Sequence, residues 1–164
     1  RGTPHLLVGM HDILFWNGGA DRGFFDVSAT AGPHFERELI SRGAAIADYD
    51  NDGDVDIFIV NNGGPGVLLQ NQGPAGNNWL EITLRGSGGN TRGIGARVRL
   101  EAAGRVFIQE IGSQSSYMSQ NSAVAHFGLG TISNIDRIEV RWPGGRSTVI
   151  RDVTPNQLIQ IDET

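Results

Sequence analysis

Five aspartates within nine residues are the feature of this sequence that is most able to do chemistry. Residues 48–56 read DYDNDGDVD, with a carboxylate at every second position and Gly53 between the third and fourth aspartates. Two unit charges about 5 Å apart repel by roughly 1 kcal/mol even in water, and by more near a protein surface. We therefore expect this stretch either to stay solvated or to hold a cation.

The spacing of the aspartates favours calcium. Ca²⁺ takes about six to eight oxygen ligands, and aspartates at alternate positions of a loop can curl around one ion when a glycine permits the sharp turn. The residues at these positions are Asp48, Asp50, Asp52 and Gly53, after which Asp54 would give its backbone carbonyl and Asp56 its carboxylate. An acidic, solvated turn remains the alternative.

The loop differs from an EF-hand. An EF-hand needs an acidic residue at the twelfth position, where this chain has Ile59. The flanking sequences GAAIA and VDIFIV also have the composition of strands rather than of helices. The prediction is therefore a calcium loop that joins two β-strands.

The composition and charge of the chain limit the classes of function that it can have. The chain has 164 residues, 38% of them hydrophobic and 19% charged, which is typical of a globular protein. A net charge of −5 argues against nucleic acid as a partner. No apolar run is long enough to span a membrane. Because the chain opens with Arg1, we expect a mature product or a piece of something longer.

Two residue types are missing altogether. Without cysteine the chain has no disulfides, thiolate nucleophiles or Cys-ligated zinc. All 13 basic residues are arginine, so Schiff-base chemistry and a P-loop lysine are excluded as well.

Short β-type runs, separated by Gly, Asn and Pro, predict an all-β fold. The expected strands are 13–16, 24–27, 44–47, 56–60, 67–70, 79–85, 96–101, 105–111, 123–127, 136–142, 147–151 and 157–161. Several alternate between apolar and polar residues, as Leu80, Ile82 and Leu84 do against Glu81, Thr83 and Arg85, which is typical of a β-sandwich. One helix is expected at residues 34–41, after Pro33.

The chain is expected to have two parts. Residues 73–76, which are rich in glycine and proline, predict a boundary near residue 76 and hence domains 1–76 and 77–164. ILFWNGG at 13–19 is echoed by VLLQNQG at 67–73, and a period of this length suits a blade-like β-repeat.

Both parts resemble known families. RGAAIADYDNDGDVDIFIVNNGG and LFWNGGADRGFFDVSATAG resemble the FG-GAP or VCBS repeat, whose blades in integrin-type β-propellers carry a D-x-D-x-D-G-x-x-D calcium loop. Residues 77–163 resemble the ASPIC/UnbV domain that follows such repeats, through NNWLEITLRG, GIGARVRLEA, SQSSYMSQNS, HFGLG, DRIEVRWPGG and DVTPNQLIQID. The resemblance implies a propeller-blade-like calcium hairpin followed by a β-sandwich. One calcium loop is too few to close a propeller ring by itself.

No catalytic constellation is evident in the sequence. The four histidines (His5, His11, His34 and His126) form no H-E-x-x-H motif, and no G-x-S-x-G elbow is present. His126 alternates into a strand, which favours a structural role. Carboxylate pairs for glycoside hydrolysis stay open because their separation is spatial. The polar stretch 113–122 is either a binding loop or an ordinary connection.

The resulting hypothesis is a non-catalytic, calcium-binding module for adhesion or recognition, secreted or periplasmic, with a protein or glycan ligand. This role is what the family resemblance implies, and residue chemistry supports the Ca²⁺. Self-association and membership of a longer chain stay open. The alternative is an accessory carbohydrate-binding module of a larger secreted enzyme, for which exposed aromatics at Trp16, Trp79 or Trp142 would be needed. A third interpretation, a hydrolase in its own right, has no residues to support it.

Overall fold

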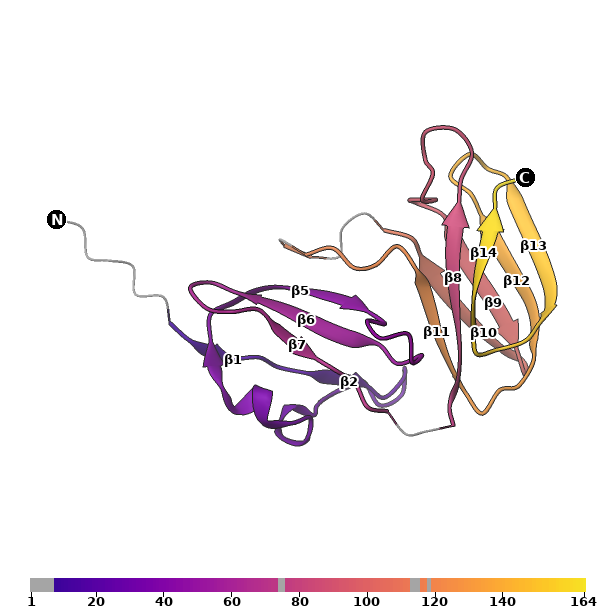
Figure 1. Ribbon diagram of the computed structural model, residues 1–164. Coiled ribbons are helices and arrows are strands. Elements are labelled where there is room, and N and C mark those ends of the chain that lie inside the picture. Colours follow the sequence, from indigo (N-terminus) through magenta and orange to yellow (C-terminus); the bar gives the residue numbers. More distant parts are fainter. Residues whose placement is uncertain (1–7, 74–75, 113–115, 118) are drawn as a thin grey trace. The chain divides into compact units, whose positions relative to one another are not determined.

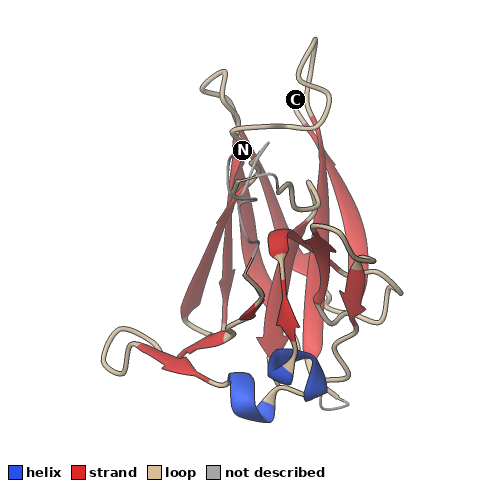
Figure 2. Ribbon diagram, turned by 90° about the vertical axis from the view of Figure 1, so that its left-hand side faces the viewer, coloured by secondary structure: helices blue, strands red, loops and turns tan. Residues whose placement is uncertain are grey.

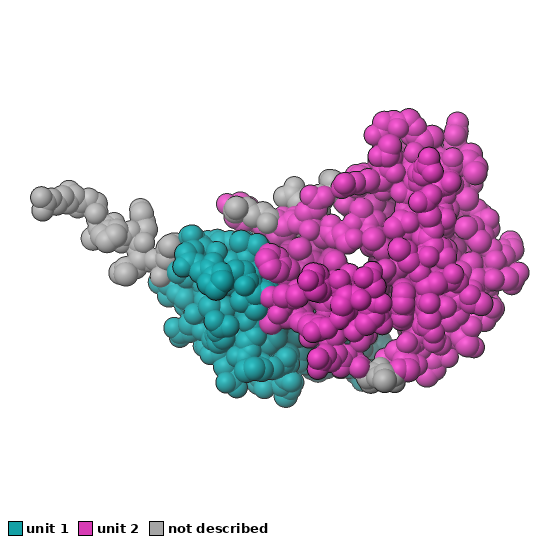
Figure 3. Space-filling view, in the orientation of Figure 1, with its two compact units in different colours: residues 1–43, 59–67 teal, residues 44–58, 68–164 magenta. Residues whose placement is uncertain are grey.

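The computed structural model describes residues 8–73, 76–112, 116–117 and 119–164. It divides into two compact units (Figure 3): unit 1 comprises residues 1–43 and 59–67, and unit 2 comprises residues 44–58 and 68–164. The acidic loop therefore belongs to the same compact unit as the second half of the chain. The boundary expected near residue 76 stays a prediction.

Unit 1 contains short strands and turns. Strands β1 (Met10–His11) and β4 (Glu38–Leu39) form one antiparallel pair, and β2 (Phe15–Asn17) and β3 (Phe24–Asp26) form another. Two 3-10 helices, η1 (Ser28–Thr30) and η2 (Pro33–Glu36), lie between β3 and β4 and are blue in Figure 2.

The helix expected at residues 34–41 is wrong. Only the 3-10 turn η2 forms there, and it ends at Arg37 in an extended conformation. The next two residues pair with β1, Leu39 opposite Met10 and Glu38 opposite His11. Pairing with a distant strand thus overrides the local helical pattern, as tertiary context commonly does.

The acidic loop lies between two neighbouring strands. Strands β5 (Ser41–Ala47), β6 (Asp56–Asn61) and β7 (Val67–Leu69) form a three-stranded sheet in the order β5-β6-β7 (Figure 1). Residues 48–55 connect β5 to β6, so a β-hairpin presents the aspartates, as the strand-like flanks predicted.

Two further sheets make up the sandwich of unit 2. One has the order β10-β9-β12-β13, from β9 (Arg97–Ala102), β10 (Arg105–Glu110), β12 (Ile135–Arg141) and β13 (Ser147–Val153). The other has the order β11-β8-β14, from β8 (Asn78–Arg85), β11 (Ala125–Gly130) and β14 (Gln157–Asp162). The pair β8 and β14 is parallel, and the other pairs in these two sheets are antiparallel.

The core lies between these two sheets. The apolar residues of the alternating strands, such as Leu80, Ile82, Val98, Ile138 and Val140, are fully buried. The predicted all-β fold is thereby confirmed, and so is the burial of the apolar faces of these strands. No helix among the described residues is long and apolar enough to cross a membrane.

Candidate metal centre

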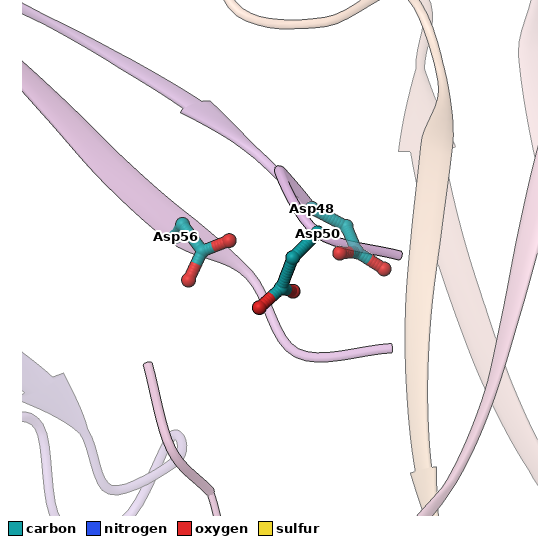
Figure 4. A group of neighbouring side chains, drawn as sticks. All are labelled: Asp48, Asp50 and Asp56. Carbon is teal, nitrogen blue, oxygen red and sulfur yellow. The ribbon is translucent and has the colours of Figure 1, made fainter. Parts of the chain in front are cut away.

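Three of the five predicted aspartates come together at the end of the β5–β6 hairpin. Oxygen atoms from Asp48, Asp50 and Asp56, one from each carboxylate, lie within 4.8 Å of one another. Figure 4 shows that they come from two segments: Asp48 and Asp50 follow β5, and Asp56 begins β6. The chain reversal between these segments is what brings the first and last aspartates of the motif together.

Backbone amides hold Asp48 in place. One Asp48 carboxylate oxygen accepts a hydrogen bond from the N–H of Asp52 (3.2 Å), and the other accepts one from Gly53 (2.8 Å). These bonds curl the loop back over its own first residue. A carboxylate oxygen has two lone pairs, so each Asp48 oxygen can still bind a cation.

Asp56 is the most buried of the five aspartates, with 2% of its surface exposed. Its carboxylate accepts hydrogen bonds from the N–H groups of Tyr49 (2.9 Å) and Asn71 (2.7 Å). The residue therefore ties the loop, the start of β6 and the segment after β7 together. Because these hydrogen bonds hold the Asp56 carboxylate in one position, its oxygens are fixed as potential ligands for a cation.

The other aspartates take different positions. Asp50 is exposed, and its carboxylate accepts a hydrogen bond from the Gln70 side chain. An oxygen of Asp52 accepts the N–H of Asp54 at 2.9 Å. The Asp52 and Asp54 carboxylates lie outside the close group of three. The predicted ligand roles of Asp52 and of the Asp54 carbonyl stay predictions.

The donor set fits calcium chemically. All three convergent side chains offer oxygen, the atom that Ca²⁺ prefers, and no nitrogen or sulfur ligand joins them among the described residues. The free lone pairs, backbone carbonyls and water could complete a shell of the usual size. The loop is thus able to hold a hard cation.

Both the backbone conformation at position 53 and the neighbouring Trp79 side chain require glycine there. The φ of Gly53, +93°, lies in the left-handed region, and a Cβ there would come within 2.0 Å of the Trp79 indole nitrogen. The indole on β8 therefore packs directly against the loop backbone. The sequence predicted the glycine for its turn, but it did not predict the contact with Trp79.

A second contact fixes the same peptide. The His126 Nε2 atom of β11 lies 2.7 Å from the carbonyl oxygen of Gly53. Because a carbonyl oxygen accepts hydrogen bonds, Nε2 carries the proton and donates it. His126 therefore has the structural position that its alternation favoured, on a strand that supports the acidic loop.

Glu81 corrects the sequence-based interpretation of β8. The alternating pattern placed it on the polar side with Thr83 and Arg85, yet only 7% of its surface is exposed. It is the cross-strand neighbour of His126. Burial raises the pKa of the Glu81 carboxyl above its ordinary value, the charge of Asp48 raises it further, and His126 lowers it.

The three tryptophans differ in their exposure. Trp142 is a core residue, 3% exposed, whose indole N–H donates to Thr148 Oγ1 at 2.9 Å. Trp79 is half-buried against Gly53. Trp16 is 52% exposed, beside Phe25 with 5.8 Å between ring centroids. Only Trp16 has the exposure that the carbohydrate-binding alternative would need.

Unit 1 contains a Ser, His and Asp set that does not have the order of a catalytic triad. Asp12 accepts from Ser41 Oγ at 3.0 Å and contacts His34 Nε2 at 2.8 Å through the same oxygen. The carboxylate thus stands between the hydroxyl and the imidazole. A serine nucleophile needs the histidine itself within hydrogen-bond reach, so this arrangement offers an ordered polar cluster rather than an activated nucleophile.

The polar stretch at 113–122 lies partly outside the described residues. Within the described part, Ser119 Oγ accepts the N–H of Ala44 and Asn121 Oδ1 accepts the N–H of Ile46, both at 3.0 Å. These bonds join the stretch to β5 inside unit 2. They show one structural role for it, and a role in ligand binding stays a prediction.

Known proteins resemble this chain in its second half and beyond. A family model described as "ASPIC and UnbV" matches residues 86–164. Cartilage acidic protein 1 of Homo sapiens is 30% identical over 137 residues, which are 80% of this chain and 20% of that protein. The Mus musculus protein of the same name is 30% identical over 137 residues, 80% of this chain and 21% of its own length. The Xenopus tropicalis protein is 30% identical over 108 residues, 63% of this chain and 16% of its own.

The family model covers only part of the chain, and the chain covers only part of its relatives. The chain spans about a fifth of the length of the first two relatives. The FG-GAP/VCBS resemblance of residues 14–32 and 42–64 stays a prediction, because the family model begins at residue 86. The second half of the chain is similar to the ASPIC and UnbV family, as its motifs predicted.

Proposed function

We propose that this chain is a calcium-binding, non-catalytic module that acts in recognition or adhesion outside the cell. The observation that carries the proposal is the convergence of Asp48, Asp50 and Asp56 at the tip of one hairpin. Without a cation these carboxylates repel one another, and a bound Ca²⁺ would relieve the repulsion.

The loop is well placed to pass the effect of calcium to the rest of unit 2. Its central peptide contacts Trp79 on β8 and His126 on β11. Ordering the loop with Ca²⁺ would therefore also order the surface that the loop forms with these strands. An ordered surface of this kind could bind a protein or a glycan. Outside the cell the calcium concentration is high enough to fill even the weaker calcium sites of extracellular modules.

Calorimetric titration of chelator-treated protein with CaCl₂ tests the calcium part. Wild type should show one saturable site. Asp50→Asn should weaken calcium binding at least tenfold, because it removes one of the three convergent carboxylates. The variant should still fold, since Asp50 is exposed and its replacement leaves the core intact. Asp136→Asn is the matched control, because it removes one exposed carboxylate elsewhere in unit 2. Wild type without a saturable calcium signal would contradict the proposal.

The recognition part needs a separate experiment. An array of glycans and matrix proteins, probed with and without calcium, should give binding that EDTA removes and Asp50→Asn impairs. Binding that is identical with and without calcium would show that ligand recognition does not depend on the calcium site. Fractionation of the source cells tests the location, and protein confined to the cytosol would contradict an exported role.

A carbohydrate-binding module is the second candidate, and the exposure of Trp16 favours it. Its indole lies beside Phe25, and the guanidinium carbon of Arg22 lies 5.8 Å from the ring centroid. An exposed aromatic pair could stack on a sugar ring. Loss of glycan binding in Trp16→Ala, with calcium binding unchanged, would favour this candidate.

A further inference from the structure

Unit 2 contains a cavity of about 530 Å³ whose walls carry three carboxylates, Asp48, Glu81 and Glu110. All of its lining residues belong to unit 2, which is drawn in magenta in Figure 3. His126 is the only basic residue among the described residues of the lining. Because Asp48 also belongs to the candidate metal centre, the carboxylates that the cavity does not share with that centre are Glu81 and Glu110.

Glu81 is the residue that points to a ligand. Its side chain lines the cavity while only 7% of the residue is exposed, and none of the described residues donates a hydrogen bond to its carboxylate. The Glu81 oxygens are not among the fully enclosed side-chain atoms of the described residues that lack a partner. A cation that enters the cavity can therefore reach this carboxylate and offset the cost of its burial. His126 interacts with Glu81 electrostatically, but its Nε2 proton is donated to the carbonyl oxygen of Gly53 and not to Glu81.

The geometry argues against a metal ion as the missing partner. Among the described residues, the close group of carboxylates is Asp48, Asp50 and Asp56, which excludes Glu81 and Glu110. A Ca²⁺ site draws its oxygens to about 2.3–2.6 Å from one ion. Carboxylates spread around a cavity of this size suit a larger cation instead.

The rest of the lining shows what kind of cation would fit. Apolar side chains of Ile46, Val55, Ile111 and Val124 form part of the walls. A methylene chain packs favourably on such walls while its charged end reaches a carboxylate. These 164 residues contain no lysine, so none of their side chains supplies an ammonium group.

We propose that this cavity binds a primary alkylammonium group, with Glu81 as its anion and the apolar wall along its methylene chain. The group could come from a lysine side chain of a partner or from a free amine. This inference deepens the recognition part of the proposed function and rests on it. The cavity and the calcium site share Asp48, but Glu81, the proposed anion, is outside the group of three aspartates.

Titrations followed by two-dimensional amide NMR test the proposal on the full chain. The probes are a capped Gly-Lys-Gly peptide, its Nζ-acetylated form and n-pentylamine, each added in calcium and again in EDTA. The lysine peptide should give saturable shifts around Glu81, Gln109 and His126 in both conditions. The acetylated peptide should give none. Tighter binding of the lysine peptide than of pentylamine identifies a partner's lysine as the source, and the reverse identifies a free amine.

Two variants and a control make the outcome decisive. Glu81→Gln should weaken binding at least fivefold, and the control Glu36→Gln, which removes an exposed charge in unit 1, should leave it unchanged. Val124→Lys brings an ammonium to the cavity and should abolish binding, which provides a second test if Glu81→Gln fails to fold. Absence of saturable shifts with both amines, or unchanged affinity in a folded Glu81→Gln, would overturn the proposal. Neither result would decide whether the chain binds calcium, because the calorimetric titration tests calcium binding separately.

Discussion

The imidazole of His126 donates a hydrogen bond to the carbonyl oxygen of Gly53, with 2.7 Å between Nε2 and the oxygen. The two residues are 73 positions apart in the sequence. One belongs to a sandwich strand and the other to the acidic loop, so this bond holds the candidate metal centre on the sandwich. Trp79 supports the same peptide from β8.

Replacing His126 with alanine should lower the free energy of unfolding by about 1 kcal/mol, because it leaves a partly buried carbonyl without its donor. It should also weaken calcium binding severalfold, since the loop loses a support. Urea denaturation and calorimetry measure the two effects. His11→Ala, an exposed histidine in unit 1, is the control. Wild-type values for both quantities in His126→Ala would show that the bond contributes nothing.

Gly53→Ala should destabilise the protein more than Gly19→Ala does. The two glycines have nearly equal φ angles, +93° and +92°, so an alanine meets similar backbone strain at each. At Gly19 nothing lies within 4 Å of an added Cβ, whereas at Gly53 the Trp79 indole occupies that space. The overpacking should cost about 1–3 kcal/mol beyond the strain. Equal losses in thermal denaturation of the two variants would refute the contact with Trp79.

Glu81 gives a pH dependence with a definite sign. Its pKa is raised in the folded protein, chiefly by burial, so the folded state binds its proton more tightly than the unfolded state does. The stability associated with this group is therefore present below the unfolded pKa and is lost as the pH rises through the folded pKa.

Glu81→Gln should accordingly raise the unfolding midpoint at pH 7, and its advantage over wild type should shrink as the pH falls below the ordinary range of a glutamate. Urea unfolding of both proteins in EDTA across this range measures the difference. A midpoint at pH 7 that falls on substitution would mean that the ionised carboxylate is stabilising.

Calcium should stabilise the fold through mass action. A ligand that binds only the native state adds about 2.7 kcal/mol at a hundredfold excess over its dissociation constant. The melting temperature of wild type should therefore rise with calcium and fall on adding EDTA, whereas Asp50→Asn should respond little. An EDTA-insensitive melting temperature in wild type would show that the native state gains nothing from the ion.

Local patterns in the sequence predicted much of this fold. Short β-type runs between turn residues located the sandwich strands, and alternation in several of them predicted which face is buried, as at Leu80 and Ile82. The spacing of the five aspartates predicted one shared site, and three of their carboxylates, Asp48, Asp50 and Asp56, lie close together. Each of these patterns is local, because the residues that form it lie within a few positions of one another in the sequence.

The parts that sequence reasoning missed depend on distant contacts. The burial of Glu81 and the positions of Trp79 and His126 follow from the loop lying on β8 and β11, and no local pattern encodes that packing. The expected helix at 34–41 failed for the same reason, since β4 pairs with β1 almost thirty residues away.

Terbium luminescence tests the central claim, a cation held by Asp48, Asp50 and Asp56, most directly. Tb³⁺ replaces Ca²⁺ at oxygen sites and emits when a nearby tryptophan is excited, and Trp79 packs against this loop. The account predicts sensitised emission that calcium displaces, that Trp79→Phe largely removes and that Asp50→Asn weakens, while Trp16→Phe leaves it intact. Emission that is absent, or that depends on Trp16 and not on Trp79, would contradict a metal centre at this loop.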